Sequence, residues 1–247
     1  MRTFVFGDVH GAGLELQALL EQCKIVPEVD LVYLVGDVFD RGIYGHLVWD
    51  LIKKYQMKVL RGNHEQKFID FFMGKKKFLP LHYFWAINNL IDHGVEISEF
   101  VNFLHKTPLL VKDRNCIIVH AGILLSNPIE ENLSANVYGN LPSNQPMPIL
   151  KDSNWWDFYC GNYLVLYGHL SQKDGTPRIR KYSNRINSIG LDTSAVNGGS
   201  LTAYCIEEEK IYTFKSGVNY FADLQKNLKN KQLILNSKVI DWIKDFT

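Results

Sequence analysis

Five short polar strings, each placed directly after an apolar run, constrain this chain more than any other feature of its sequence. They are GDVHG at 7–11, GDVFDRG at 36–42, RGNHE at 61–65, VHAG at 119–122 and YGH at 167–169. The preceding runs are rich in β-branched or aromatic residues, which is typical of buried strands. In an open α/β sheet, the carboxyl ends of the strands converge on one crevice. We therefore expect the carboxylate, imidazole and amide groups of the five strings to meet at one edge.

A single string of this kind would indicate only a turn, because Gly-Asp, Gly-His and Gly-Asn pairs are common in turns. Five metal-competent strings in order, each at the end of a predicted strand, instead favour a shared site for more than one metal ion.

The composition describes a compact globular protein that has no strong electrostatic preference for a polyanion. The chain has 247 residues, of which 46% are hydrophobic, and 27 basic residues nearly balance 26 acidic ones. A net charge of +1 would not hold the protein on nucleic acid or on an anionic membrane. We expect neither as a partner, and any attraction for phosphate must be local.

The start of the chain and its cysteines favour a cytoplasmic location. The first predicted strand, residues 2–6, begins one residue after Met1, and no apolar run approaches the roughly 20 residues of a membrane helix. The four cysteines form no CxxC pair, so we expect them to be reduced and mostly structural.

The first third of the chain alternates predicted strands and helices, which implies βαβ units with a parallel core. The predicted strands cover 2–6, 31–35 and 58–60, and the predicted helices cover 14–23, 44–55 and 65–73. Residues 75–106 have apolar residues at helical spacing, so we expect a helical insertion at about 66–106.

The second half has a different rhythm, with a long loop between groups of strands. Strands are predicted at 109–112 and 116–120, followed by a loop at about 126–154 that is rich in Asn, Pro and Ser. Long loops of this kind are usually functional. Four further strands, expected to be antiparallel, are predicted at 163–167, 188–191, 200–206 and 210–215. The apolar spacing at about 236–246 predicts a C-terminal helix that docks on the core. No repeat or linker divides the chain, and we expect a single domain over 1–247.

The polar strings supply ligands for two divalent ions. Asp8 and His10 leave one predicted strand two residues apart, and Asp37 at the next strand end is placed to bridge to a second ion. The six expected ligands are Asp8, His10, Asp37, Asn63, His120 and His169. Ligands without thiolates suit Mn²⁺, Fe²⁺ or Zn²⁺, and we expect Mn²⁺. A hydroxide shared by two such ions can attack phosphorus in line.

Three neighbouring residues have the chemistry for the remaining steps of phosphoester hydrolysis. His64, paired with Asp40, is expected to act as the general acid for the leaving group. Arg41 offers a planar fork for phosphoryl oxygens, and Asn63 is expected to contact substrate as well as metal. Gly42 and Gly62 are expected to let the backbone turn sharply beside the site.

Together with GLDTSAVNGGSLTA at 190–203, these motifs resemble the phosphoprotein phosphatase family of calcineurin-like metallophosphoesterases over residues 2 to about 215. The small bacterial and phage-type members include Ser/Thr protein phosphatases and dinucleoside tetraphosphatases. The resemblance implies an α/β fold of two mixed β-sheets flanked by helices. It also implies the six metal ligands, the acid His64 with Asp40, and phosphate binding by Arg41.

Two positions depart from the family pattern. Family members often carry a second phosphate-binding arginine between the HAG and GH blocks, but no arginine occurs between Ala121 and His169. Asp157 lies near the expected place, so either Lys151 or Arg178 replaces the arginine or phosphate affinity is weaker. Ser194 stands where the family commonly has glycine.

The remaining histidines and most aromatic residues are expected to have structural roles. These histidines are His46, His82, His93 and His105. The aromatic residues between 68 and 85 are expected mainly in the core, although some could line the substrate cleft and stack on a nucleobase.

Three functions remain open at this point. The string RGNHEQ at 61–66 favours a Ser/Thr protein phosphatase acting on phosphorylated protein. The alternative is a dinucleoside polyphosphate hydrolase with a small nucleotide substrate. A third possibility, prompted by the missing arginine, is a metal-binding or phosphate-binding module without turnover.

Overall fold

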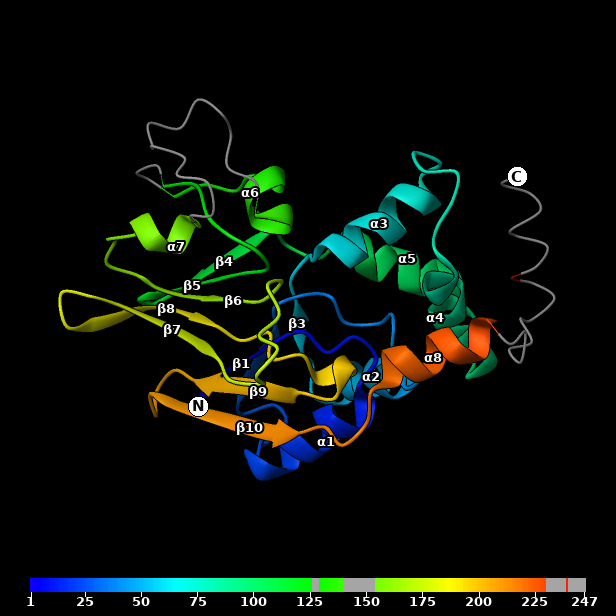
Figure 1. The fold of residues 1–247 in the computed structure, drawn as a ribbon, viewed down its shortest axis with the longest axis horizontal. Coiled ribbons are helices and arrows are strands. Elements are labelled where there is room, and N and C mark those ends of the chain that lie inside the picture. The colour runs from blue at the N-terminus through cyan, green and yellow to red at the C-terminus, as the bar shows by residue number, and fades with distance from the viewer. Residues whose placement is uncertain (126–128, 140–153, 230–238, 240–247) are drawn as a thin grey trace.

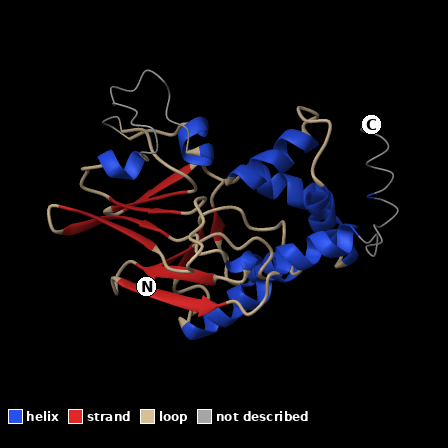
Figure 2. Ribbon diagram, viewed as in Figure 1, coloured by secondary structure: helices blue, strands red, loops and turns tan. Residues whose placement is uncertain are grey.

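Two five-stranded sheets form the centre of the molecule, with helices on their outer sides (Figure 1). The computed structural model describes residues 1–125, 129–139, 154–229 and 239. Strand order is β10-β9-β1-β2-β3 in the first sheet and β4-β5-β6-β8-β7 in the second. Helices and strands lie in separate layers (Figure 2). This is the two-sheet α/β fold that the resemblance implied.

The first sheet confirms the parallel core predicted for the first third of the chain. Its parallel strands are β1 (Thr3–Phe6), β2 (Leu31–Leu34) and β3 (Lys58–Val59), and its antiparallel pair is β9 (Ser200–Cys205) and β10 (Lys210–Lys215). The crossover helices are α1 (Gly13–Gln22) and α2 (Gly45–Lys54). Apolar side chains of α1 and α2 pack with those of β1 and β2 in one core cluster. The βαβ rhythm thus places three strand ends at one edge.

The second sheet corrects the expectation that the later strands are all antiparallel. Its strands are β4 (Leu110–Asp113), β5 (Cys116–Val119), β6 (Leu164–Tyr167), β7 (Arg178–Tyr182) and β8 (Arg185–Gly190). β6 pairs in parallel with both β5 and β8, and β8 belongs to a different sheet from β9.

The expectation failed because the sequence analysis did not predict the strand β7. Its RIRKY sequence is largely exposed and lacks an apolar alternation. It forms a tight hairpin with β8 through Ser183 and Asn184, both with positive φ. The chain therefore reverses once more than expected, and β8 returns parallel to β6.

Two apolar layers hold the sheets together and cover the second one. Val5 and Tyr33 of the first sheet pack against Ile118 and Leu166 of the second in a shared cluster. On the other face of the second sheet, Trp155 and neighbouring aromatic residues pack onto β5 and β6. The sheets are thus fixed relative to each other, and so are the loops at their carboxyl ends.

Helices α3 (Asn63–Phe72), α4 (Leu81–Asp92) and α5 (Ile97–His105) form an aromatic-rich layer beside the first sheet. Phe39, Phe68, Tyr83 and Phe100 are fully buried there and meet mostly edge to face. The helical content expected at about 66–106 is confirmed. Because Phe39 and Tyr83 belong to this layer, it also supports the loops that carry the candidate site.

Four short elements complete the described chain. They are α6 (Leu133–Tyr138), α7 (Trp155–Phe158), the 3₁₀ helix η1 (Ala195–Asn197) and α8 (Tyr220–Lys229). α6 lies inside the expected loop at 126–154, and α8 was not predicted. Apart from the buried Val239, the helix predicted at 236–246 lies outside the described residues.

The cysteines and the helix lengths bear on two further expectations. All four cysteines are free thiols, three of them buried and Cys160 exposed. None of the helices in the described part of the chain is long and apolar enough to cross a membrane.

Candidate active site

The loops that follow β1, β2, β3, β5 and β6 converge and bring all six expected metal ligands together. Three of these ligands have left-handed backbone conformations, namely His10 (φ 46°), Asp37 (φ 54°) and His169 (φ 68°). Arg41 also has a positive φ of 68°. Such conformations are costly for residues other than glycine and cluster at functional sites. The unusual backbone conformations of these loops therefore occur at the residues that present the polar groups of the site.

Glycines beside the site allow close packing of the loops. A Cβ atom on Gly62 would lie 2.2 Å from Asp37 Oδ1, and one on Gly168 would lie 1.9 Å from Asp8 Oδ1. Gly62 has an extended conformation (φ −88°, ψ 173°), and Gly42 would meet the backbone oxygen of His10 at 2.4 Å. The sharp turn expected at Gly62 is therefore wrong, whereas the chain does bend at Gly42, whose N–H lies 2.8 Å from the carbonyl oxygen of Asp40. Lack of space explains glycine at both positions.

Two ligand groups share one carboxylate. Asp8, His10 and Asp37 form one group, and Asp37, His120 and His169 form the other, each with ligand atoms within 4.8 Å of one another. Asp37 Oδ2 lies 3.7 Å from His10 Nε2, and Asp37 Oδ1 lies 3.5 Å from His120 Nε2. Asp37 is thus placed between the two groups, as a bridging ligand would be.

The second group leaves lone pairs facing each other. His120 Nδ1 lies 3.0 Å from the carbonyl oxygen of Val35, so this nitrogen carries the proton and Nε2 carries a lone pair. That lone pair faces the Asn63 oxygen at 3.0 Å and His169 Nδ1 at 3.2 Å. Two acceptors, the His120 nitrogen and the Asn63 oxygen, thus face each other, an arrangement that a cation between them would stabilise. The donor set therefore fits a divalent metal ion.

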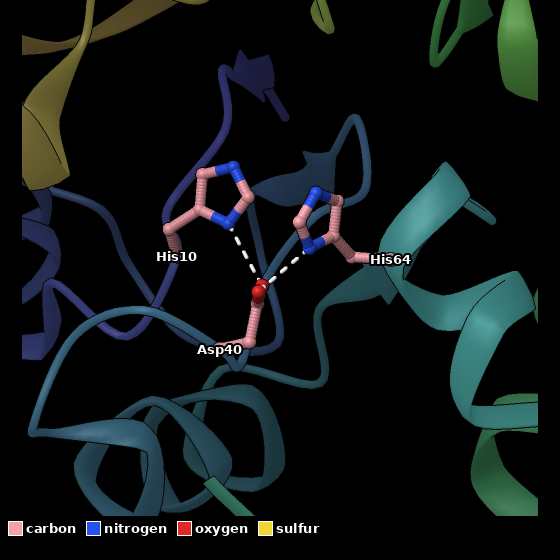
Figure 3. Close-up of side chains that lie close together, drawn as sticks. All are labelled: His10, Asp40 and His64. Carbon is pink, nitrogen blue, oxygen red and sulfur yellow. Dashed lines mark hydrogen bonds and ion pairs between the residues drawn. The ribbon is translucent and has the colours of Figure 1, made fainter. Parts of the chain in front are cut away.

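The candidate acid is held by a buried carboxylate. His64 Nδ1 lies 2.6 Å from Asp40 Oδ2, while His10 Nδ1 lies 2.9 Å from Asp40 Oδ1 (Figure 3). Asp40 is fully buried. Because it accepts from Nδ1 of His10, it leaves His10 Nε2 free for a ligand. Asp40 thus orients an expected metal ligand as well as the expected acid, which the sequence did not indicate.

The pKa values of the ionisable groups of the site are shifted in opposite directions. Burial raises the pKa of Asp37, but nearby histidines, above all His120, oppose it, and the net shift is downward. Burial also lowers the pKa of His64, but Asp37 and Asp40 outweigh it and raise the pKa overall. Burial and His120 lower the pKa of His169 to about 4. His64 is thus suited to hold a proton, whereas His169 is suited to bind as a neutral ligand.

Arg41 spans the space between the first metal group and the acid. Its Nη1 lies 3.1 Å from His10 Nε2, and its Nη2 lies 3.1 Å from His64 Nε2. The guanidinium also lies over the ring of Phe221 on α8, 5.3 Å from the centroid. The expected phosphate-binding fork is therefore at the centre of the site.

A cavity lined mainly by polar side chains opens above these groups. Its lining combines site residues with the start of η1, namely Asp8, His10, Asp37, Arg41, Asn63, His64, His169, Ser171, Asp192, Ser194, Ala195, Val196 and Asn197. Five of the six predicted ligands, all but His120, thus face this space together with the acid and the arginine.

Sequence reasoning missed several polar residues of the site. Asp192 follows β8 at the same edge and is buried, and its pKa is raised to about 6 by burial and by Asp37. Glu65 accepts the backbone N–H groups of Gly62 and Asp37 and holds these loops together. Asp192 lies within the GLDTSAVN string, so its place after a strand could have revealed it.

Two aromatic residues of α4 also contact the acid pair. Tyr83 places its hydroxyl 2.8 Å from His64 Nδ1, and His82 Nε2 lies 3.4 Å from Asp40 Oδ2. Both were expected to be structural, since helical spacing alone cannot distinguish a core position from one beside the site.

The structure shows what surrounds the departures from the family pattern. Arg178 stacks on Trp156 at 4.6 Å and is not among the described residues lining the cavity. Asp157 pairs with Arg180 at 2.9 Å, and Lys151 lies outside the described residues. Ser194 has the left-handed conformation (φ 65°) that favours glycine, and its hydroxyl contacts Ser171. Serine therefore tolerates the geometry that the family pattern assigns to glycine.

A two-sheet fold whose strand ends gather carboxylates and imidazoles defines a metallophosphoesterase. A family model for calcineurin-like phosphoesterases matches residues 1–193, and the chain belongs to this family.

Several curated relatives are named bis(5'-nucleosyl)-tetraphosphatases. A symmetrical bis(5'-nucleosyl)-tetraphosphatase of Pectobacterium atrosepticum is 24% identical, with 86% of this chain and 94% of the relative covered. The asymmetrical bis(5'-nucleosyl)-tetraphosphatase PrpE of Oceanobacillus iheyensis is 26% identical, with 90% and 96% covered. A symmetrical enzyme of Haemophilus ducreyi is 29% identical, with 85% and 71% covered.

Solved structures support the fold. A candidate diadenosine tetraphosphatase superimposes with a TM-score of 0.66 at 19% identity, covering 87% of this chain and 93% of the other. A Ser/Thr protein phosphatase of Saccharomyces cerevisiae gives a TM-score of 0.51 at 12% identity, with 88% and 80% covered.

Proposed function

We propose that this protein hydrolyses dinucleoside tetraphosphates. The observation that carries the proposal is the similarity, over most of both chains, to curated bis(5'-nucleosyl)-tetraphosphatases of both the symmetrical and the asymmetrical kind. The Ser/Thr protein phosphatase that RGNHEQ favoured has weaker support, because the yeast phosphatase shares the fold at only 12% identity. Family membership also favours an enzyme over a module without turnover.

The metal ligands follow from the two groups that share Asp37. Asp8, His10 and Asp37 would hold one divalent ion, and Asp37, Asn63, His120 and His169 would hold the other. We propose Mn²⁺, because carboxylate, amide and imidazole donors without a thiolate suit such an ion. Bound there, the ions would polarise the phosphoryl oxygens and lower the pKa of the attacking water.

Arg41 and His64 supply the remaining chemistry. The Arg41 guanidinium, which in this structure donates to His10 and His64, can instead donate to two phosphoryl oxygens in a planar fork. His64 Nε2 faces the cavity, and Asp40 fixes the ring from the opposite nitrogen. A proton held at Nε2 can pass to the leaving oxygen as the bond to phosphorus breaks.

Product analysis tests the proposal. Purified protein loaded with Mn²⁺ is incubated with diadenosine tetraphosphate, and with a phosphoserine peptide in parallel, and the products are separated by anion exchange. We expect kcat/KM for the dinucleotide to exceed that for the peptide by about 100-fold or more. Two ADP molecules would indicate symmetrical cleavage, and ATP plus AMP would indicate asymmetrical cleavage.

A matched control shows whether a contaminating enzyme contributes to the measured activity. The His64→Asn variant, purified in the same way, should lose most of the dinucleotide turnover. A preference for the phosphopeptide in the wild-type protein, absent from this variant, would contradict the proposal and favour a protein phosphatase. The expected cytoplasmic location stays a prediction, which fractionation of the source cells would test.

A further inference from the structure

The described cavity has few positive charges for a substrate with several negative ones. Among the described residues that line it, Arg41 is the one Lys or Arg side chain. A dinucleoside tetraphosphate carries charge on each phosphoryl group of its chain. The two ions would lie at the phosphoryl group that is hydrolysed, and one guanidinium can bind one phosphoryl group in a fork, so a further cation would stabilise the rest of the phosphate chain.

Lys67 is placed to supply that cation. It lies three residues after His64 on α3, so the two side chains occupy neighbouring positions on the helix. Lys67 is half-buried, and its Nζ lies 5.9 Å from the centre of the Tyr83 ring. The Tyr83 ring in turn stacks on that of His64, with centroids 5.4 Å apart. The ammonium group is therefore one aromatic ring away from the candidate acid.

The charged groups that influence Lys67 belong to the candidate site. Burial lowers the pKa of Lys67, while the carboxylates of Asp37 and Asp40 raise it and the charge of Arg41 lowers it. Lys67 also contributes to the low pKa of His169, which belongs to the second sheet. None of the ion pairs among the described residues involves Lys67. Its ammonium group thus lies in the field of the site without a carboxylate of its own.

We propose that Lys67 binds the substrate phosphate next to the one held by Arg41, and so selects polyphosphate chains over single phosphoryl groups. This inference rests on the proposed function. Arg41 contacts His64 at Nε2, whereas Lys67 approaches it from the side of Tyr83, which contacts Nδ1. Lys67 is not among the described residues that line the cavity, so its side chain would extend past Tyr83 to meet a phosphate chain that passes His64.

Substrate discrimination tests the role of Lys67. In the Mn²⁺-loaded protein, Lys67→Met should raise KM for diadenosine tetraphosphate about tenfold, which is the loss expected for one charged contact. It should leave kcat/KM for p-nitrophenyl phosphate within about twofold, because that substrate has a single phosphoryl group. Lys67→Arg keeps the charge and should restore the low KM.

The exposed Lys181 on β7 offers a matched control with the same loss of charge. Lys181→Met should leave the kinetic constants for both substrates unchanged. An equal effect of Lys67→Met on both substrates, or no effect on either, would overturn the proposal. Circular dichroism of each variant should match the wild-type spectrum, which excludes unfolding as the cause.

Binding of inorganic tripolyphosphate separates this inference from the proposed function. Isothermal titration of the metal-free protein should show about tenfold weaker binding to Lys67→Met than to the wild type, with inorganic phosphate affected less. If the wild type fails to cleave dinucleotides but this difference appears, the proposed function fails and the role of Lys67 stands. If dinucleotides are cleaved but the difference is absent, only the role of Lys67 is overturned.

Discussion

The two sheets contribute different chemistry to the same site. The edge of the first sheet presents mainly carboxylates, Asp8, Asp37 and Asp40 beside His10, whereas the edge of the second presents mainly imidazoles, His120 and His169 beside Asp192. The carboxylates supply negative charge, and the imidazoles supply neutral lone pairs. The group of Asp8, His10 and Asp37 lies wholly on the first sheet, but the other group needs His120 and His169 from the second. The packing between the sheets is therefore a condition for the two-ion site. Asp37 is the residue at which the two contributions meet.

The largest effect is expected from removing this shared charge. Asp37→Asn should lower turnover on the order of 10³-fold, because both ligand groups lose their common anionic oxygen. Steady-state kinetics on p-nitrophenyl phosphate would measure the loss. Since His64 also hydrogen-bonds to Asp37 through its backbone, circular dichroism should verify the fold. Activity close to that of the wild type would show that the two groups do not depend on Asp37.

A second prediction separates acid catalysis from metal binding on the first sheet. His64→Asn should lower kcat about 10²- to 10⁴-fold and leave the metal content unchanged, because His64 is outside both groups that share Asp37. Elemental analysis and kinetics on the same preparation would measure both quantities. A loss of metal in parallel with activity would contradict the division of roles.

The role of His64 as the acid also predicts the direction in which activity changes with pH. Asp37 and Asp40 raise the pKa of His64 despite its burial, so the protonated acid persists to higher pH than an ordinary histidine. Wild-type activity should therefore fall as the pH rises through a value above about 6.5. The profile of His64→Asn should lack this alkaline limb, and a profile that keeps it would assign the limb to another group.

The third prediction probes the second sheet. Burial raises the pKa of Asp8, and the charges of Asp192 and Asp37 raise it further. A bound cation would relieve this repulsion between the carboxylates. Asp192→Asn should weaken Mn²⁺ binding about tenfold, as expected for a residue that supports the ligands. Calorimetric titration with Mn²⁺ would measure it. Tighter binding in the variant would show that Asp192 opposes rather than supports the ions.

The smallest effect on activity is expected far from the site, at the amino end of the first sheet. Asp30 accepts hydrogen bonds from the backbone of Arg2 and Val26 and pairs with the Arg2 guanidinium at 2.7 Å. Asp30→Asn should cost about 2 kcal/mol of unfolding free energy at neutral pH and leave turnover unchanged. Urea denaturation would measure the cost, and an equal loss of turnover would link this end of the sheet to the site.

This stabilisation should depend on pH. Burial opposes ionisation of Asp30, but the hydrogen bonds from Arg2 and Val26 outweigh it and lower the pKa. The contribution is therefore present above the pKa of the unfolded state, about 3.9, and is lost as the pH falls through the lower folded value. The difference between Asp30→Asn and the wild type should shrink in acid.

The first sheet was readable from the sequence because its signals are local. Each apolar run ends in a polar string, and the intervening helices have clear apolar spacing, so the parallel core around Asp8 and Asp37 followed from the βαβ rule. The convergence of His120 and His169 on the same place followed from the rule for strand ends.

The second sheet was harder to predict because its order depends on contacts distant in sequence. The exposed, charged strand at Arg178–Tyr182 has no apolar alternation, and without it the parallel pairing of Leu164–Tyr167 could not be foreseen. The same limit hid Tyr83, whose contact with His64 arises from neighbours in space rather than from a motif.

The stoichiometry of metal binding tests the central claim most directly, namely that the two sheets together form a site for two ions around Asp37. Equilibrium dialysis of the wild-type protein and of Asp37→Asn against Mn²⁺, followed by elemental analysis, gives the number of ions per chain. The account predicts two ions in the wild type and fewer than one in the variant. One ion in the wild type, or two in the variant, would contradict it.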